Sequence, residues 1–568
     1  MPRTTLALTS FVSGEFSAKM DGRTDFDKYS SGTKTLENFL VHPQGAATRR
    51  VGTQFIAEVK DSSKKTRLIP FEFSTTQTYI MEFGDQYIRF YKDKGQILSG
   101  GSAYEISSPF LEAELFDIKF AQSADVMYLC HPNHDVRKLS RTGHTSWTLA
   151  TVSFSGSPSL PISGSNNRPS CVSFFEQRLV FANTNNNPQT LWFSKAGDYE
   201  NFTTGTNADD AMIYTIASNQ VNAIQYLKAV RTLVVGTSGG EFTVSADGTD
   251  ASITPTNVTI KRQSSFGSAG VDAIPAGNAI LFLQKAKRKI RELAYNFDSD
   301  GYVAPDLTIL NDTVTKSGIV QMIFQQEPDS IIWCVRDDGE LAGLTYQRSE
   351  NVVSWHRHIF GGVFGNGNSV CESAASISGT LTEDELWVIV KRTINGATKR
   401  YVECFSDFDF DETDATDFKF LDSHLSYSGS ATTSLSGLAH LEGQSVSILA
   451  DGSVHANKTV SSGSVSLDRS VTKACVGLAY DSVLQTMRIE GGAAEGTSQG
   501  KTKRISKVVL RLFETVGVKV GPSLSDLETV PFRTTSSNLS APVDTLLAGD
   551  KEIEFRDDYN SDGFIFIK

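Results

Sequence analysis

Short apolar runs separated by polar turns make up most of the chain, which shows little of the helical periodicity that amphipathic helices need. The runs are rich in Val, Ile, Phe, Tyr and Thr, and they are interrupted by Gly, Asn, Asp and Ser. Residues of the first kind favour the pleated, half-buried backbone of β-strands, and those of the second kind favour turns. The sequence therefore predicts an all-β protein.

Seven pairs of apolar runs recur along the middle of the chain, and each pair has the pattern of a β-hairpin. The pairs are 79–83 with 87–90, 126–129 with 136–139, 179–181 with 191–193, 233–235 with 241–244, 280–283 with 290–293, 331–335 with 341–344, and 386–390 with 400–405. Measured between the first residues of successive pairs, the spacings are 47, 53, 54, 47, 51 and 55 residues.

This spacing is typical of a β-propeller, because four short strands with their turns use roughly 40–50 residues. A single four-stranded sheet cannot bury both of its faces, so sheets of this kind stack around a common axis. We therefore expect a propeller of six or seven blades. The alternative interpretation is a set of unrelated hairpins in a β-sandwich.

The limits of the regular spacing divide the chain into four parts. Residues 1–70 form an N-terminal leader, and residues 71–405 form the propeller. In residues 406–540 the content of Ser, Thr and Gly rises and the spacing stops, which predicts an appended or inserted small β domain. Residues 541–568 contain the runs 551–555 and 563–567, which predict closing strands in the form of a hairpin.

The charge and the cysteines narrow the class of protein. Lys and Arg number 53 and Asp and Glu number 65, so the net charge is -12 and the surface is not expected to coat nucleic acid. The six cysteines are far apart and form no CxxC pattern, which predicts buried free thiols in a reducing compartment. No apolar run approaches the ~18 residues of a membrane span, and the N-terminus lacks the pattern of a signal peptide.

Two segments look like ligand loops but lack residues that their chemistry requires. In the glycine-rich segment 491–502, Glu495 stands where a phosphate-binding loop needs Gly. In the acidic run 407–412, Glu412 replaces the glycine of a calcium loop and Phe418 replaces its final glutamate. An EF-hand is therefore excluded, and a solvated acidic loop is favoured over an irregular cation site.

The histidine pairs His131 with His134 and His356 with His358 have no Cys or carboxylate at a convincing spacing for zinc, so we interpret them as packing or interface residues. The chain also lacks a Gly-x-Ser-x-Gly motif between a strand and a helix, and it lacks a sialidase-type Ser-x-Asp-x-Gly box. We expect no catalytic residue, no cofactor and no metal.

One basic segment deserves a functional hypothesis. Lys285, Lys287, Lys289 and Arg291 occupy every second position, so in an extended backbone they would share one face of the strand. Such a row would attract an acidic neighbour or a phosphate backbone. The segment is thus a candidate contact face for a partner subunit or DNA, and the alternative is a solvated hairpin face.

The leader contains a recognisable series of short motifs: Asn38-Phe-Leu-Val41, Pro43-Gln-Gly45, and Ala47-Thr-Arg49-Arg50-Val-Gly52-Thr53 before the strand-like run 55–59. Together they resemble the opening of podovirus tail nozzle proteins, also called tail tubular protein B. Val51 stands where such proteins often have Pro. Similar texture recurs at 178–194 and 331–356, so the resemblance covers roughly residues 20–405.

The resemblance implies a structural virion protein rather than an enzyme. Such nozzles are homohexamers built around a propeller, and they form the distal end of a short phage tail. They bind the tail adaptor ring, carry fibres or spikes, and gate and conduct the genomic DNA during ejection. The protein would be made in the bacterial host cytoplasm. Asn38, Arg49 and Arg50 are then candidates for docking to the adaptor or to another subunit, and residues 406–540 are a candidate tip or lumen region.

The charges agree with this hypothesis. The leader has 11 basic against 7 acidic residues, which suits docking to another subunit, and six copies at -12 would form an acidic assembly that repels DNA phosphate. Two alternatives stay open: a glycan-binding or glycan-hydrolysing propeller on the phage tail, and a scaffold propeller for cellular partners.

Overall fold

The computed structural model describes residues 5–156, 160–217, 220–248, 251–298, 300–379, 383–407, 415–491, 497–532 and 546–568. Within these residues the chain folds almost entirely into β-strands. The helical segments are six short 3-10 turns: η1 (Ala18–Met20), η2 (Asp27–Ser31), η3 (Glu112–Asp117), η4 (Arg348–Glu350), η5 (Ala415–Asp417) and η6 (Ala439–Leu441). None of the described helices has the length and hydropathy needed to span a membrane.

Seven antiparallel units of four strands form a β-propeller. The first three units are β6 (Arg67–Ser74), β7 (Gln77–Gly84), β8 (Tyr87–Lys92) and β12 (Glu105–Ser107); β13 (Lys119–Ser123), β14 (Val126–His131), β15 (His134–Gly143) and β16 (Ser146–Thr151); and β17 (Cys171–Phe175), β18 (Arg178–Ala182), β19 (Thr190–Phe193) and β20 (Met212–Thr215).

The remaining four units continue in the same order. They are β21 (Ile224–Ala229), β22 (Leu233–Thr237), β23 (Gly240–Ala246) and β24 (Val258–Ser264); β25 (Ile274–Ala276), β26 (Ala279–Leu283), β27 (Ile290–Asn296) and β28 (Gly301–Val303); β29 (Ile319–Gln325), β30 (Ile331–Arg336), β31 (Leu341–Gln347) and β32 (Val352–His358); and β35 (Val370–Ser378), β36 (Asp384–Ile394), β37 (Ala397–Phe405) and β5 (Thr53–Glu58).

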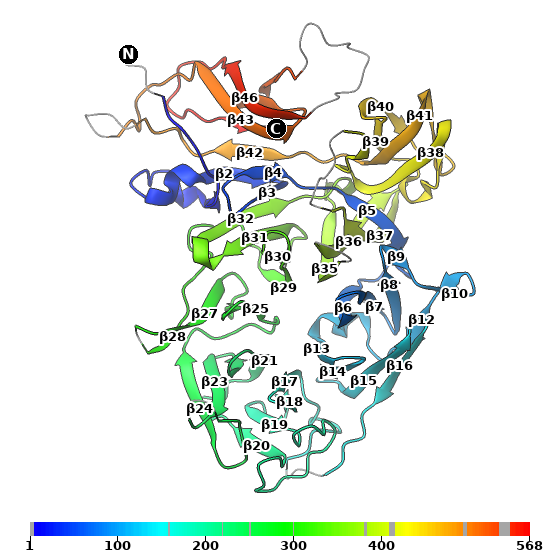
Figure 1. Ribbon diagram of the computed structural model, residues 1–568, viewed down its shortest axis with the longest axis vertical. Helices are drawn as coiled ribbons and strands as arrows, with labels where there is room; N and C mark the ends of the chain where they lie inside the picture. The colour runs from blue at the N-terminus through cyan, green and yellow to red at the C-terminus, as the bar shows by residue number, and fades with distance from the viewer. Residues whose placement is uncertain are drawn as a thin grey trace.

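The units surround a common axis, with the first strand of each unit nearest the centre (Figure 1). Each pair of neighbouring units encloses its own apolar cluster, and one of these clusters joins the seventh unit to the first and so closes the ring. The closing cluster contains Leu68 and Ile80 from the first unit and Trp387 and Val402 from the seventh. Burial of apolar side chains between sheets therefore holds the ring together.

All seven predicted hairpins are present, and each supplies the second and third strands of one unit. The predicted boundary of the leader differs from the structure. β5 is the outer strand of the seventh unit, where Tyr401 pairs with Glu58 and Phe405 pairs with Thr53. Residues 53–58 thus belong to the propeller, because the seventh unit has no fourth strand of its own.

Most of the other strands extend two propeller sheets at the upper end of the view in Figure 1. The sixth unit continues into β1 (Gly14–Glu15), β2 (Gly32–Glu37), β42 (Val483–Thr486), β47 (Phe566–Ile567), β44 (Lys519–Ser523) and β45 (Asp526–Thr529). The seventh continues from β5 into β38 (Asp422–Ser436), β41 (Ser464–Leu478), β39 (Ser445–Ala450) and β40 (Ser453–Thr459).

Three small hairpins and one ribbon complete the described strands. They are β3 (Phe39–Val41) with β4 (Ala47–Arg49), β10 (Leu98–Ser99) with β11 (Ser102–Ala103), β33 (Val363–Phe364) with β34 (Gly367–Asn368), and the ribbon of β43 (Lys507–Thr515) with β46 (Leu547–Glu554); β9 (Gly95–Gln96) pairs with β8. The predicted closing hairpin is absent from these pairings. β46 pairs with β43, and β47 pairs with β42 and β44. These strands pack into one apolar cluster that contains Val508, Val520 and Ile553 and that Ile567 contacts.

Candidate functional site

Two of the three predicted docking residues lie inside the protein. Asn38 and Arg50 are buried, and the Nε of Arg50 donates to the side-chain oxygen of Asn38 at 2.9 Å. Arg50 also forms a bidentate ion pair with Asp422, with N–O distances of 2.8 and 2.7 Å. Asn38 in turn donates to the carbonyl of Asp481 at 2.6 Å. These side chains therefore join the leader to residues 422–481 and offer no surface to another protein.

The surroundings of Arg50 explain why a charge is tolerated there. Its guanidinium lies 3.7 Å from the centre of the Tyr480 ring and donates to the carbonyl of Ile359. Burial opposes the charged forms, but the attraction between the partners outweighs it, so the pKa of Asp422 is lowered and the pKa of Arg50 is raised. Arg49 is the exposed member of the predicted set, and its guanidinium lies 4.7 Å from the centre of the same Tyr480 ring.

The predicted row of basic residues is not extended. Residues 285–289 form the turn between β26 and β27, and Lys287 has a left-handed φ of 60°. Lys289 forms an ion pair with Asp306 at 2.8 Å, and Arg291 lies 3.5 Å from the centre of the Phe266 ring. Since the turn points the side chains in different directions, the segment does not present the single cationic face that the alternating pattern predicted.

The axis of the propeller is crossed by bonds between opposite units. Lys119 begins β13 in the second unit, and its Nζ donates to the carbonyl of Gly270 at 2.6 Å. The same nitrogen forms an ion pair with Asp272 at 2.9 Å, two residues before β25 of the fifth unit. Figure 1 places these two units on opposite sides of the centre. A DNA duplex could not pass along this axis without breaking those bonds.

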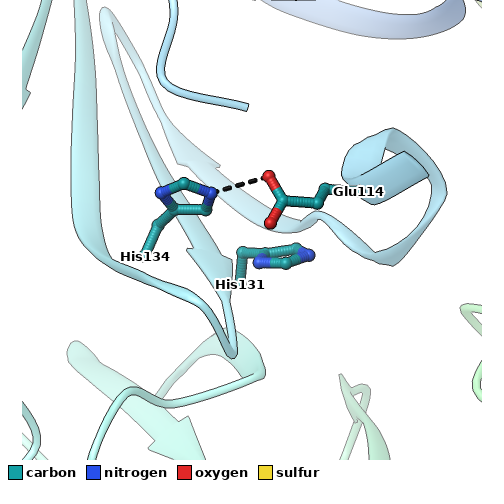
Figure 2. A group of neighbouring side chains, drawn as sticks. All are labelled: Glu114, His131 and His134. Atoms are coloured by element: carbon teal, nitrogen blue, oxygen red, sulfur yellow. Dashed lines mark hydrogen bonds and ion pairs between the residues drawn. The ribbon is translucent and has the colours of Figure 1, made fainter. Parts of the chain in front are cut away.

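A cluster of Glu114, His131 and His134 has the residue types of a zinc site, and sequence spacing did not reveal it (Figure 2). Glu114 comes from η3, whereas His131 ends β14 and His134 begins β15. The possible ligand atoms lie within 4.8 Å of one another. The 3-10 turn η3 brings the Glu114 carboxylate to the two histidines. The sequence feature that could have indicated this site is the acidic segment 112–117, which precedes β13.

The hydrogen bonds of this cluster favour a polar clamp over a metal site. The Glu114 carboxylate accepts from His134 Nε2 at 2.7 Å, from Asn133 at 3.0 Å and from the Leu111 amide at 3.0 Å. Burial alone would raise the pKa of Glu114, but these donors lower it to about 2. His131 Nδ1 accepts the amide of Asn133 at 3.1 Å, so its proton is on Nε2. Zinc would have to displace at least the hydrogen bond between His134 and Glu114 and the proton on His131 Nε2.

The second histidine pair is also a packing pair, as predicted. His356 and His358 are both buried, and a 2.6 Å hydrogen bond joins His356 Nδ1 to His358 Nε2. Burial lowers the pKa of His356 to about 3, so the pair is neutral at physiological pH. The six cysteines are buried and free, in agreement with the sequence analysis. Asp409, Asp411, Glu412 and Glu495 lie outside the described residues.

A large open groove of about 3610 Å³ lies next to the propeller, between the β43–β46 ribbon and the β39–β40 hairpin. Its walls carry exposed apolar side chains, of which Val454 is 88% exposed, Phe513 78% and Val509 55%. Val509 and Phe513 lie on the same face of β43, because they are four residues apart along a strand. Exposed apolar side chains gathered in one place are typical of surfaces that bind another protein.

The chain matches no protein-family model and no curated protein sequence. Among solved structures it is similar to the β-propeller domain of Cps50 (Swd1) from Myceliophteria thermophila, with 9% identity and a TM-score of 0.38 over 62% of this chain and 100% of that one. It is also similar to the RRP9 WD40 repeats, with 9% identity and a TM-score of 0.40 over 63% of this chain and 98% of that one. These likenesses concern the fold of the propeller alone.

Proposed function

We propose that the protein is a structural component of a short-tailed phage virion: a homohexameric tail nozzle at the distal end of the tail tube. In this role it docks to the tail adaptor, carries fibre or spike proteins, and gates and conducts genomic DNA during ejection. It would be synthesised in the cytoplasm of the bacterial host. The motif in residues 38–53, which resembles the nozzle family, carries this proposal.

The position of that motif supports a mechanical role. Asn38, Arg50 and Gly52 lie where the propeller, the leader and residues 419–481 meet, so the motif holds the parts of the molecule in a fixed arrangement. The crossed axis also bears on the proposal. Because Lys119 and Asp272 block the centre of each propeller, a DNA conduit would have to form between copies of the chain.

The groove supplies surface that assembly would bury. Val509 and Phe513 are exposed in the single chain, and a neighbouring copy that covered them would remove their apolar area from water. A head-to-tail contact of this kind closes into a ring when the rotation between copies divides a full turn evenly. The net charge of -12 per copy would give the ring an acidic character that disfavours retention of DNA phosphate.

The full chain, purified and examined by light scattering and negative-stain imaging, tests the proposal. We expect particles with the mass of six 61.9-kDa chains arranged around an open centre, formed either alone or on addition of a tail adaptor ring. A chain that stays monomeric in both conditions would contradict the proposal. Release of reducing ends from host-envelope polysaccharide would favour the glycan-active alternative instead.

A further inference from the structure

A shallow pocket of about 450 Å³ lies on one face of the propeller, where three neighbouring units meet. Its wall includes Ser123 at the end of β13, Gln177 in the turn after β17, and Arg231 in the turn after β21. These three strands are the innermost strands of the second, third and fourth units, so the pocket lies where they end (Figure 1). Its volume is in the range of sites that bind small molecules.

Two aromatic side chains form the apolar part of the pocket. The ring centres of Phe174 and Tyr199 lie 4.9 Å apart, and the ring planes are inclined at 67°. Both residues are half-buried, because they pack on the apolar cluster between the second and third units. The amide of Gly197, near Tyr199, donates to the carbonyl of Gln177 at 2.9 Å and so fixes the segment that carries the tyrosine. The rings therefore offer a platform that is ordered before a ligand binds.

The polar side chains of the pocket are planar groups with unused hydrogen-bonding capacity. No hydrogen bond or ion pair joins the side chain of Gln177 or Arg231 to another residue in the described part of the chain. The Oε2 atom of Glu176 accepts the amide of Ile253 at 2.7 Å, and its other carboxylate oxygen is available to a ligand. Glu176 and Arg231 are the charged residues among those that line the pocket, so their charges cancel.

Aromatic rings beside planar amide, carboxylate and guanidinium groups match the chemistry of a pyranose sugar. The faces of the sugar ring carry C–H groups with a slight positive charge, which the negative face of an aromatic ring attracts. The rim of the sugar carries neighbouring hydroxyls that both donate and accept hydrogen bonds. A planar side chain with two polar atoms can bond two such hydroxyls at once. Because the pocket has no net charge, a neutral sugar fits it better than a charged one.

We propose that this pocket binds a pyranose unit of a neutral saccharide, with the sugar ring against Tyr199. Glu176, Gln177 and Arg231 bind its hydroxyls. Glu176 is the single carboxylate among the lining residues, whereas hydrolysis of a glycosidic bond commonly uses two, so we expect binding without cleavage. The inference goes beyond the proposed function and is independent of it, because residues of one chain form the whole pocket.

An array of immobilised neutral oligosaccharides, built from glucose, galactose, mannose or N-acetylglucosamine, tests the proposal with the full chain. We expect the natural chain to bind at least one of them and to release no reducing ends from it. Tyr199→Ala should bind at least tenfold more weakly, because the sugar ring loses its apolar platform. Absence of binding to every neutral saccharide, or cleavage of the bound one, would overturn the proposal. A monomeric chain that binds sugar would contradict the nozzle but not this site.

A second variant keeps the test decisive if Tyr199→Ala folds poorly. Gln177 has a left-handed φ of 59°, which glycine adopts without strain, so Gln177→Gly should fold well and lose only the amide group. We expect several-fold weaker binding.

The matched control is Gln86→Gly, because Gln86 is exposed, has a φ of 66° in the turn between β7 and β8, and does not line the pocket. Gln86→Gly should bind the saccharide as the natural chain does. Equal affinity in Gln177→Gly and the natural chain would overturn the proposal, and so would equal losses in the two glycine variants.

Discussion

Arg50 makes its bonds to three stretches of chain that are far apart in sequence: the leader at Asn38, the segment at Ile359, and Asp422. Replacing Arg50 with Met should reduce the free energy of unfolding by about 3–5 kcal/mol, because Asp422 would remain buried without its cation. Chemical denaturation of the full chain measures this loss.

The matched control is the exposed ion pair of Arg511 with Asp550, whose side chains are 80% and 58% exposed. Arg511→Met should change the free energy of unfolding by less than about 1 kcal/mol. The double variant Arg50→Met with Asp422→Asn should lose less than the sum of the two single changes, because the partners share one interaction. Losses of equal size in Arg50→Met and Arg511→Met would contradict the role assigned to Arg50.

Buried histidines make the stability of the fold depend on pH. Burial lowers the pKa of His424 and His440 from 6.5 to about 4. The unfolded chain therefore binds protons at a higher pH than the folded chain, so stability is complete above about pH 6.5 and is lost as the pH falls. Each histidine should cost on the order of 3 kcal/mol at pH 4.

Thermal unfolding measured from pH 7 to pH 4.5 tests this prediction with His440→Gln. Glutamine can still donate to the carbonyl of Ser423, which His440 Nε2 bonds at 2.9 Å, but it does not titrate. We expect a smaller acid-induced fall of the midpoint than in the natural chain. His144→Gln, at an exposed position, should leave the fall unchanged. An identical pH profile for His440→Gln would show that other groups cause the acid sensitivity.

At the scale of elements, the middle strands of the propeller units were the most predictable. Each predicted hairpin pairs two apolar runs across a short turn, so both partners are visible within one stretch of sequence. The inner strands were harder to predict, because some are short and mixed, such as β25 (Ile274–Ala276). The role of β5 could not be predicted, since its partner β37 ends almost 350 residues later in the chain.

The sequence did not predict the environment of the candidate site residues, because that environment depends on the tertiary structure. Arg50 has the polarity of a surface residue, and only the distant Asp422 makes its burial possible. His131 and His134 were recognised as a pair, but Glu114 reaches them through a tertiary contact. The basic row at 285–291 was predicted from an extended backbone, whereas residues 285–289 form a turn.

The position of β5 depends on a close contact between the backbone of Gly52 and the backbone of residues 419–421. It lies directly before β5, donates to the carbonyl of Lys419 at 2.7 Å and accepts from the amide of Ser406 at 3.0 Å. A Cβ atom at this position would lie 1.9 Å from the carbonyl oxygen of Leu421, which is backbone and cannot turn away. Gly52→Ala should therefore destabilise the fold by more than about 2 kcal/mol.

Gly22→Ala is the appropriate comparison, because no atom lies within 4 Å of the added methyl group and Gly22 is exposed. That change should leave the free energy of unfolding within about 0.5 kcal/mol of that of the natural chain. Circular dichroism during thermal unfolding measures both variants. A stable Gly52→Ala protein would mean that the segments at 52 and 421 can separate without loss.

At the scale of the whole molecule, the groove predicts where copies of the chain meet. Phe513→Ser should raise the protein concentration needed to form the proposed hexamer at least tenfold. The substitution removes most of the exposed apolar area that the aromatic ring would bury at the contact. Phe297, which is 87% exposed and follows β27 in the fifth propeller unit, provides a matched control. Light scattering over a dilution series measures the two variants.

Phe297→Ser should assemble as the natural chain does, since Phe297 is not among the residues that line the groove. Loss of assembly in both variants would point to a general effect of surface polarity. Unchanged assembly of Phe513→Ser would contradict the prediction and would mean that the copies meet through another face of the molecule.

The pairing of β5 with β37 also imposes a delay on folding during translation. The ribosome finishes β5 at Glu58, but the strand that it must join is complete only at Phe405. At about 5–20 residues per second, β5 waits for roughly 20–70 seconds with its hydrogen-bonding edges unmatched. Nascent copies on one messenger RNA are close together during that interval, so the β5 of one copy can complete the ring of another, and exchanged strands are the misfolded product to look for.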